Sequence, residues 1–146
     1  MNVNPGLKEN ITDESIAYGY TLAIWGTGAL LLTNFSITEE SILAFVLGGV
    51  LGFATLSLVA FKHFIEKVEN PKPRKVIVVS MIHILASFGT VFLNYLFMNE
   101  TSSLLSSGTI FFIAGFNVSV LYNIMLLLER YVSEDLYKIE NGANSD

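Results

Sequence analysis

Four segments without Asp, Glu, Lys or Arg dominate the chain, and each is long enough for a helix that crosses a membrane. They cover residues 15–35, 41–61, 76–98 and 104–128. A hydrocarbon core of about 30 Å needs about 20 helical residues, and backbone polar groups in lipid must be paired within the segment. The pattern therefore predicts an all-α integral membrane protein with four transmembrane helices.

The connections between these segments predict how the helices follow one another. Residues 36–40 and 99–103 are short enough to make two tight helical hairpins in an up-down-up-down bundle. Ser36 and Glu39 have the spacing of a capping box, so we expect the second helix to start there. Residues 62–75 form a longer and strongly basic loop between the two hairpins.

The basic residues lie on one side of the predicted membrane. Five of the eight are in residues 62–75, and the others are Lys8, Arg130 and Lys138, whereas the two short connections carry only acidic charges. Cytoplasmic loops are enriched in Lys and Arg. We therefore expect a protein of the cell membrane with both termini in the cytoplasm.

This topology divides the chain into five parts. Residues 1–14 are a polar lead-in, 15–61 the first transmembrane hairpin, 62–75 the basic cytoplasmic loop, 76–128 the second hairpin and 129–146 a cytoplasmic helix extension and tail. The extension continues an apolar stripe at helical spacing. That stripe either rests on the lipid headgroups or docks a partner.

The two hairpins resemble each other in sequence. An ungapped offset of 63 residues aligns residues 22–27 (LAIWGT) with residues 85–90 (LASFGT). Because biased composition also produces such identities, the match predicts an internal duplication without proving it. Two hairpins of equal orientation would be related by a pseudo-two-fold axis along the membrane normal.

Small residues mark the expected helix contacts. Ala44, Gly48 and Gly52 recur at intervals of four in the second helix, a spacing that allows close backbone approach in membranes. Further candidate packing positions are Gly26, Gly89 and Gly115. The ladder in the second helix either packs inside the bundle or forms a face for self-association.

The third segment carries a line of polar residues. His83, Ser87, Thr90 and Asn94 follow one another at intervals that place them on one helix face. Because polar side chains are costly in lipid, we expect this face to point into the bundle. The candidates for the same polar layer from the other helices are Thr21, Thr55, Ser119, Tyr122 and Asn123. The cluster either links helices by hydrogen bonds or forms a small binding or conduction site with His83 as its titratable member.

Composition removes several classes of function. A chain with 52% hydrophobic and 14% charged residues, no cysteine and a pI near 4.9 offers no disulfide, no thiolate metal site and no basic face for nucleic acid. Catalytic and phosphate-binding motifs are absent, and no carboxylate lies within the four segments. We expect no enzyme activity, no metal site and no cofactor.

The most economical expectation is a membrane protein that acts by assembly, either with itself or as a subunit of a membrane complex. The alternative is an oligomeric pore or small-solute carrier lined by the polar face of the third helix. A third hypothesis is a haem-binding redox subunit that uses His63 and His83. The loop residues that could also contact anionic lipid weakly are Lys67, Lys72, Arg74 and Lys75.

Overall fold

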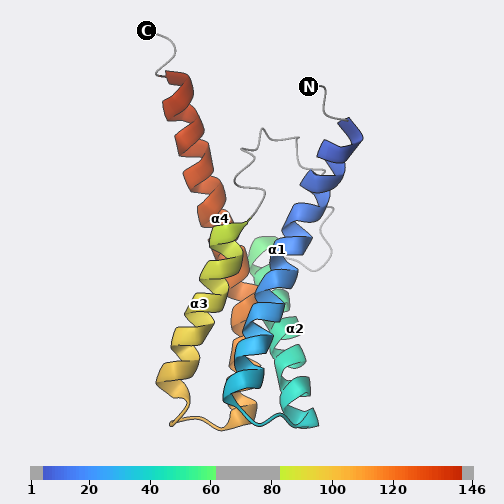
Figure 1. The fold of residues 1–146 in the computed structure, drawn as a ribbon, viewed down its shortest axis with the longest axis vertical. Helices are drawn as coiled ribbons and strands as arrows, with labels where there is room; N and C mark the ends of the chain where they lie inside the picture. Colours follow the sequence, from blue (N-terminus) through green and yellow to red (C-terminus); the bar gives the residue numbers. More distant parts are fainter. Residues whose placement is uncertain (1–4, 62–82, 143–146) are drawn as a thin grey trace.

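The computed structural model describes residues 5–61 and 83–142, and side-chain positions for 15–60, 83–129, 131 and 132 (Figure 1). This part of the chain contains four helices: α1 (Pro5–Asn34), α2 (Glu39–Phe61), α3 (Ile84–Thr101) and α4 (Ser107–Gly142). The prediction of an all-helical, four-helix protein is confirmed.

Three of the described helices are long and apolar enough to cross a membrane. These candidate spans are Ser15–Asn34, Glu39–Ala60 and Ser107–Glu129. The first seven residues of the predicted third segment, 76–82, lie outside the described residues. These spans indicate a multi-pass membrane protein in contact with lipid, while the cytoplasmic position of the termini stays a prediction.

The third helix starts later than the hydrophobic pattern predicts. His83 has φ 47° and ψ 38°, in the left-handed region, and α3 begins at the next residue. A left-handed residue cannot continue a right-handed helix. The prediction of one unbroken helix over residues 76–98 is therefore wrong at this position.

The helix α4 lies at the centre of the bundle and packs against the other three (Figure 1). It forms extensive contacts with α2 and α3, and α1 packs mainly on α3. Although α1 and α2 are joined by a short connection, they hardly contact each other. The second predicted hairpin is thus tightly packed. In the first, the short predicted connection is present, but its two helices pack on the second hairpin rather than on each other.

Both hairpin connections end in a side-chain cap of the following helix. The Ser41 amide donates to Thr38 Oγ1 at 3.2 Å at the start of α2, and the Thr109 amide donates to Ser106 Oγ at 3.4 Å at the start of α4. The capping residue of α2 is therefore Thr38 and not Ser36. Since α2 begins at Glu39, Thr38 is the residue whose side chain reaches the unpaired amides of the first turn.

The contact between α2 and α4 is a glycine seam, which we define by Gly48, Gly52 and Gly115. A Cβ at Gly48 would overlap the carbonyl oxygen of Phe112, and one at Gly115 would overlap the carbonyl oxygen of Phe45. Absent side chains thus let the two backbones touch, as is common between membrane helices. The ladder in α2 faces the interior of the bundle.

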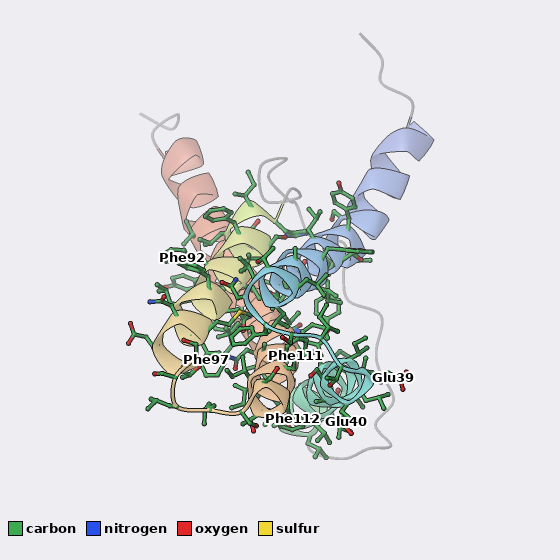
Figure 2. All side chains as sticks on the ribbon, turned by 60° about the horizontal axis from the view of Figure 1, so that its bottom comes forward. Glu39, Glu40, Phe92, Phe97, Phe111 and Phe112 are labelled. Atoms are coloured by element: carbon green, nitrogen blue, oxygen red, sulfur yellow. The ribbon has the colours of Figure 1, made fainter. Side chains whose placement is uncertain are left out.

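Two apolar clusters fill the contact between α1, α3 and α4. The cluster toward the chain termini contains Ala23, Ala86, Val118, Tyr122 and Leu126. The cluster toward the hairpin connections contains Leu31, Met98, Ile110, Phe111 and Ala114, with Ala44 packed beside it. Figure 2 shows Phe111 among the helices, while Glu39 and Glu40 lie on the outside of α2.

Buried positions in the first hairpin correspond to buried positions in the second. The residue offset between them differs from the one that the sequence predicts. The buried positions of α1 and α3 pair at an offset of 67 residues, and Gly48 and Gly115 have the same separation. The pairs in α1 and α3 are Gly19 with Ala86, Ala23 with Thr90, Thr27 with Asn94, and Leu31 with Met98. This offset is one helical turn longer than 63, and the duplication itself stays a prediction.

Candidate functional site: a polar junction of three helices

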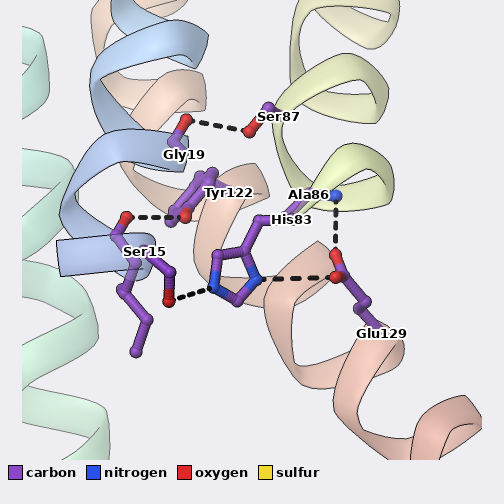
Figure 3. A network of polar contacts seen from close by, with 8 residues as sticks. Ser15, Gly19, His83, Ala86, Ser87, Tyr122 and Glu129 are labelled. Carbon is purple, nitrogen blue, oxygen red and sulfur yellow. Dashed lines mark hydrogen bonds and ion pairs between the residues drawn. The ribbon is translucent and has the colours of Figure 1, made fainter. Parts of the chain in front are cut away.

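A network of polar contacts joins α1, α3 and α4 at the ends of the candidate spans (Figure 3). We call it the polar junction and define it as Ser15, Gly19, His83, Ala86, Ser87, Tyr122 and Glu129. Ser15 is the first residue of one candidate span and Glu129 is the last residue of another. The junction therefore lies at one boundary of the predicted membrane, on the side where α1 and α4 extend beyond the bundle.

His83 occupies the middle of the junction and is 5% exposed. Its Nε2 lies 3.3 Å from Ser15 Oγ, and its Nδ1 lies 3.5 Å from Glu129 Oε1. It is the one residue other than glycine with a positive φ in the described chain. The imidazole therefore bridges α1 and α4 from the residue that immediately precedes α3.

Glu129 provides the cap that His83 does not. The His83 side chain makes no capping hydrogen bond to α3, whereas Glu129 Oε2 accepts a hydrogen bond from the Ala86 amide at 3.2 Å. Amides in the first turn have no partner within the helix, and the positive end of the helix dipole favours a carboxylate. One carboxylate of α4 thus satisfies the start of α3 and faces His83.

Glu129 is not part of the polar layer that the sequence predicts. The charge pattern places it in an extension beyond the membrane and no carboxylate within the spans, but its side chain is only 11% exposed and completes the junction. A usable signal was present, since Tyr122 and Glu129 are separated by seven residues and share one face of α4. Ser15 and Gly19 were also missed.

The other junction contacts bring α1 close to its neighbours. Ser87 Oγ donates to the Gly19 carbonyl at 2.9 Å, and Tyr122 OH donates to the Ile16 carbonyl at 2.8 Å. A Cβ at Gly19 would lie 2.6 Å from Tyr122 OH. Position 19 must therefore be glycine for α1 to approach this closely.

A second polar link crosses from α1 through α4 to α2. Ser119 Oγ donates to the Gly49 carbonyl at 2.9 Å, and this leaves Tyr20 OH to donate to Ser119 Oγ at 2.8 Å. The rings of Tyr20 and Tyr122 lie beside each other, with centroids 5.3 Å apart. This link and the polar junction hold the helices together by side-chain hydrogen bonds.

The structure divides the predicted polar layer into three groups. The first group bonds to other helices and contains His83, Ser87, Ser119 and Tyr122. Thr90, Asn94 and Asn123 donate to carbonyl groups of their own helices. Thr21 and Thr55 are exposed on the outside and also bond to their own backbones, so their predicted place in the layer is wrong because their helix faces point away from it.

The remaining predicted packing positions contact neighbouring side chains. A Cβ at Gly26 would lie 2.6 Å from Val91 Cγ2, and one at Gly89 would lie 3.5 Å from Met125 Sδ. Gly26 therefore brings α1 close to α3, while Gly89 lies beside a flexible side chain of α4.

Chemically, the polar junction can hold or exchange a proton between an imidazole and a carboxylate. The described residues contain no group of three or more His, Cys, Asp or Glu that could hold a metal ion. The described part of the chain does not include His63 or the loop residues Lys67, Lys72, Arg74 and Lys75. The predicted haem and lipid contacts therefore stay predictions.

Comparisons with protein-family models, curated proteins and solved structures give no match.

Proposed function

We propose that the protein acts by assembly in the membrane and associates with itself through the outer face of α1. We define this face by Tyr18, Thr21, Leu22, Trp25, Gly28, Ala29 and Leu32. The observation that carries the proposal is the position of Trp25, a residue that is 73% exposed.

Trp25 lies in the middle of the predicted membrane. At about 1.5 Å per residue it is about 15 Å from the level of Ser15, half the thickness of a core of about 30 Å. Tryptophan prefers the membrane–water interface, and its N–H group is a donor that needs a partner in hydrocarbon. The Trp25 indole makes no hydrogen bond to any described residue, so a protein surface is a better neighbour for it than lipid tails.

The same face has room beside the indole. A Cβ added at Gly28 would meet no atom within 4 Å, so this position leaves a shallow gap one turn from Trp25. Thr21 donates to the Ala17 carbonyl, and its hydroxyl oxygen can still accept a hydrogen bond. The outer face of α1 thus carries a protruding indole, a gap beside it and a hydrogen-bond acceptor. These features can complement the same features of a second copy, as a two-fold dimer requires.

Cysteine cross-linking in native membranes tests the proposal cleanly because the chain has no cysteine. We expect Leu22→Cys and Ala29→Cys to give disulfide-linked dimers. The matched control is Leu47→Cys on the exposed side of α2, where we expect none. Equal cross-linking at all three positions, or at none together with a monomeric mass in mild detergent, would contradict association through this face.

A matched glycine pair separates assembly from folding. A Cβ at position 28 would meet no atom within 4 Å, so we expect Gly28→Leu to keep a native fold and to weaken association by about tenfold, the equivalent of about 1.4 kcal/mol. Gly52→Leu would instead clash with the Phe116 carbonyl, 2.7 Å from the added Cβ, and disturb the fold. Unchanged association of the Gly28→Leu protein would count against the proposed face.

The second candidate function is a carrier or pore for protons or small solutes. It is favoured by the His83–Glu129 pair, because a buried imidazole beside a carboxylate is a group that can transfer a proton. Flux of protons into liposomes that contain the purified protein is the direct measurement. Flux that disappears in Glu129→Gln would support the carrier; no flux above protein-free liposomes would remove it.

A further inference from the structure

Thr27 and Asn94 stand out because each is fully buried and each keeps a polar atom without a hydrogen-bond partner. Both side chains are 0% exposed. Thr27 Oγ1 and Asn94 Oδ1 have no partner. Buried polar atoms in native proteins are nearly always paired with protein or with ordered water.

The unpaired hydroxyl of Thr27 is unusual within this chain. Threonines at helical positions commonly bond to the carbonyl three or four residues earlier, and Thr21, Thr33, Thr55, Thr90 and Thr101 do so here. Thr27 makes no such bond among the described residues, although the Ala23 carbonyl is available at the same spacing. Its hydroxyl therefore has its hydrogen-bonding capacity left for another group.

The side chain of Asn94 also lacks one hydrogen-bond partner. Its Nδ2 donates to the Thr90 carbonyl at 3.1 Å, which leaves Oδ1 as an acceptor without a donor. No direct hydrogen bond joins Thr27 Oγ1 to Asn94 Oδ1.

The packing places both residues in one layer of the bundle. Thr27 lies one turn from Ala23 and one turn from Leu31, which belong to the two different apolar clusters. Asn94 lies one turn from Met98 of the second cluster. Since Gly26 touches Val91 between the parallel helices α1 and α3, Thr27 and Asn94 differ in height by only about 3 Å at 1.5 Å per residue.

We propose that Thr27 Oγ1 and Asn94 Oδ1 together bind a single water molecule between the two apolar clusters, where it ties α1 to α3 in the middle of the membrane. Water can donate to Asn94 Oδ1 and also donate to or accept from Thr27 Oγ1. Buried waters of this kind typically make two to four hydrogen bonds to polar groups that would otherwise be unpaired. The site is separate from the proposed association face, since both residues face the inside of the bundle.

Solid-state NMR on the protein in lipid bilayers tests this directly, by transfer of magnetisation from water to the side-chain amide of Asn94. We expect a cross peak in the unchanged protein and its loss in Thr27→Val, which keeps the shape but removes the hydroxyl. Thr27→Ser keeps the hydroxyl and should keep the cross peak, and it remains informative if the valine variant folds poorly.

The matched control is Thr90→Val, one turn from Asn94, where the hydroxyl already donates to the Ala86 carbonyl. We expect this variant to retain the cross peak. Absence of the peak in the unchanged protein would overturn the proposal, and so would its survival in Thr27→Val. A direct bond between Thr27 and Asn94, seen as energetic coupling of the two residues without any water signal, would overturn it as well.

Discussion

The helices α2 and α1 are both held against the second hairpin, but by different physical means. α2 lies on α4 through a glycine seam in which backbone meets backbone, with Ser119 Oγ to the Gly49 carbonyl as the side-chain hydrogen bond between them in the described residues. α1 is attached through the polar junction, where Ser15 bonds to His83 just before α3, and the carbonyls of Gly19 and Ile16 accept hydrogen bonds from α3 and α4 respectively.

This difference separates steric from polar specificity. A glycine seam tolerates no added atom, because the neighbouring backbone cannot move aside as a side chain can. Hydrogen bonds between membrane helices contribute only about 0.6–2 kcal/mol each. We therefore expect the α2 contact to be the more sensitive to mutation and the α1 contact to be the more adjustable.

The glycine seam gives the largest expected effect. Gly115→Val would drive a Cβ into the carbonyl oxygen of Phe45, and we expect the free energy of unfolding in bicelles to fall by about 3 kcal/mol, at the upper end for overpacking. Gly108→Val on the same helix is the control, because its Cβ would meet no atom within 4 Å. Equal losses from the two substitutions would show that helix propensity rather than the seam is responsible.

The polar junction gives the next largest effect. Glu129→Ala removes the acceptor for the Ala86 amide and the partner of His83, and we expect the free energy of unfolding to fall by about 2 kcal/mol, as for hydrogen bonds to charged groups. Glu129→Gln retains a carbonyl oxygen and should lose less.

The control for this prediction is Glu40→Ala, at an exposed position at the start of α2. Chemical denaturation with reversible refolding in mixed micelles would compare the three variants. If Glu129→Gln is as unstable as Glu129→Ala, the charge and not the acceptor is what the junction needs.

The backbone of His83 allows a test that is independent of its side chain. Both His83→Ala and His83→Gly lose the imidazole, but glycine adopts φ 47° without strain. We expect the glycine variant to be more stable than the alanine variant by about 1 kcal/mol, the cost of a left-handed residue with a Cβ.

Ser87 supplies the opposite control within α3. At that helical position glycine should be worse than alanine by about 1 kcal/mol. The same order of stability at both positions would mean that residue 83 is helical in the membrane, as the sequence pattern predicts.

The sequence predicts some of these helix contacts better than others, depending on the kind of interaction. Length and hydropathy predicted the four helices because the helical requirement of lipid acts on each segment separately. The glycine spacing in α2 marked a close contact, but the two possible contacts, α4 and a second copy, have the same sequence signature. Only the three-dimensional structure shows that Phe112 and Phe116 of α4 cover Gly48 and Gly52.

The polar junction was less predictable because it depends on how distant segments meet. His83 and Ser87 were recognised from their spacing, but their partners, Glu129 and Gly19, are separated from them by 46 and 68 residues respectively. A count of charges along the chain places Glu129 outside the membrane. Residue 83 is neither glycine nor asparagine, so the sequence gives no sign of its left-handed backbone.

The smallest expected effect concerns the connection between α1 and α2, which carries little of the packing. Thr38→Ala removes the oxygen that accepts from the Ser41 amide at 3.2 Å and lies 3.0 Å from Ser41 Oγ, and we expect a loss of about 0.5 kcal/mol, at the low end for a helix cap. Ser36→Ala should have no measurable effect, since α2 begins after Thr38. Thermal unfolding of both variants in one detergent makes the comparison, and a larger loss from Ser36→Ala would restore Ser36 as the cap and move the start of α2.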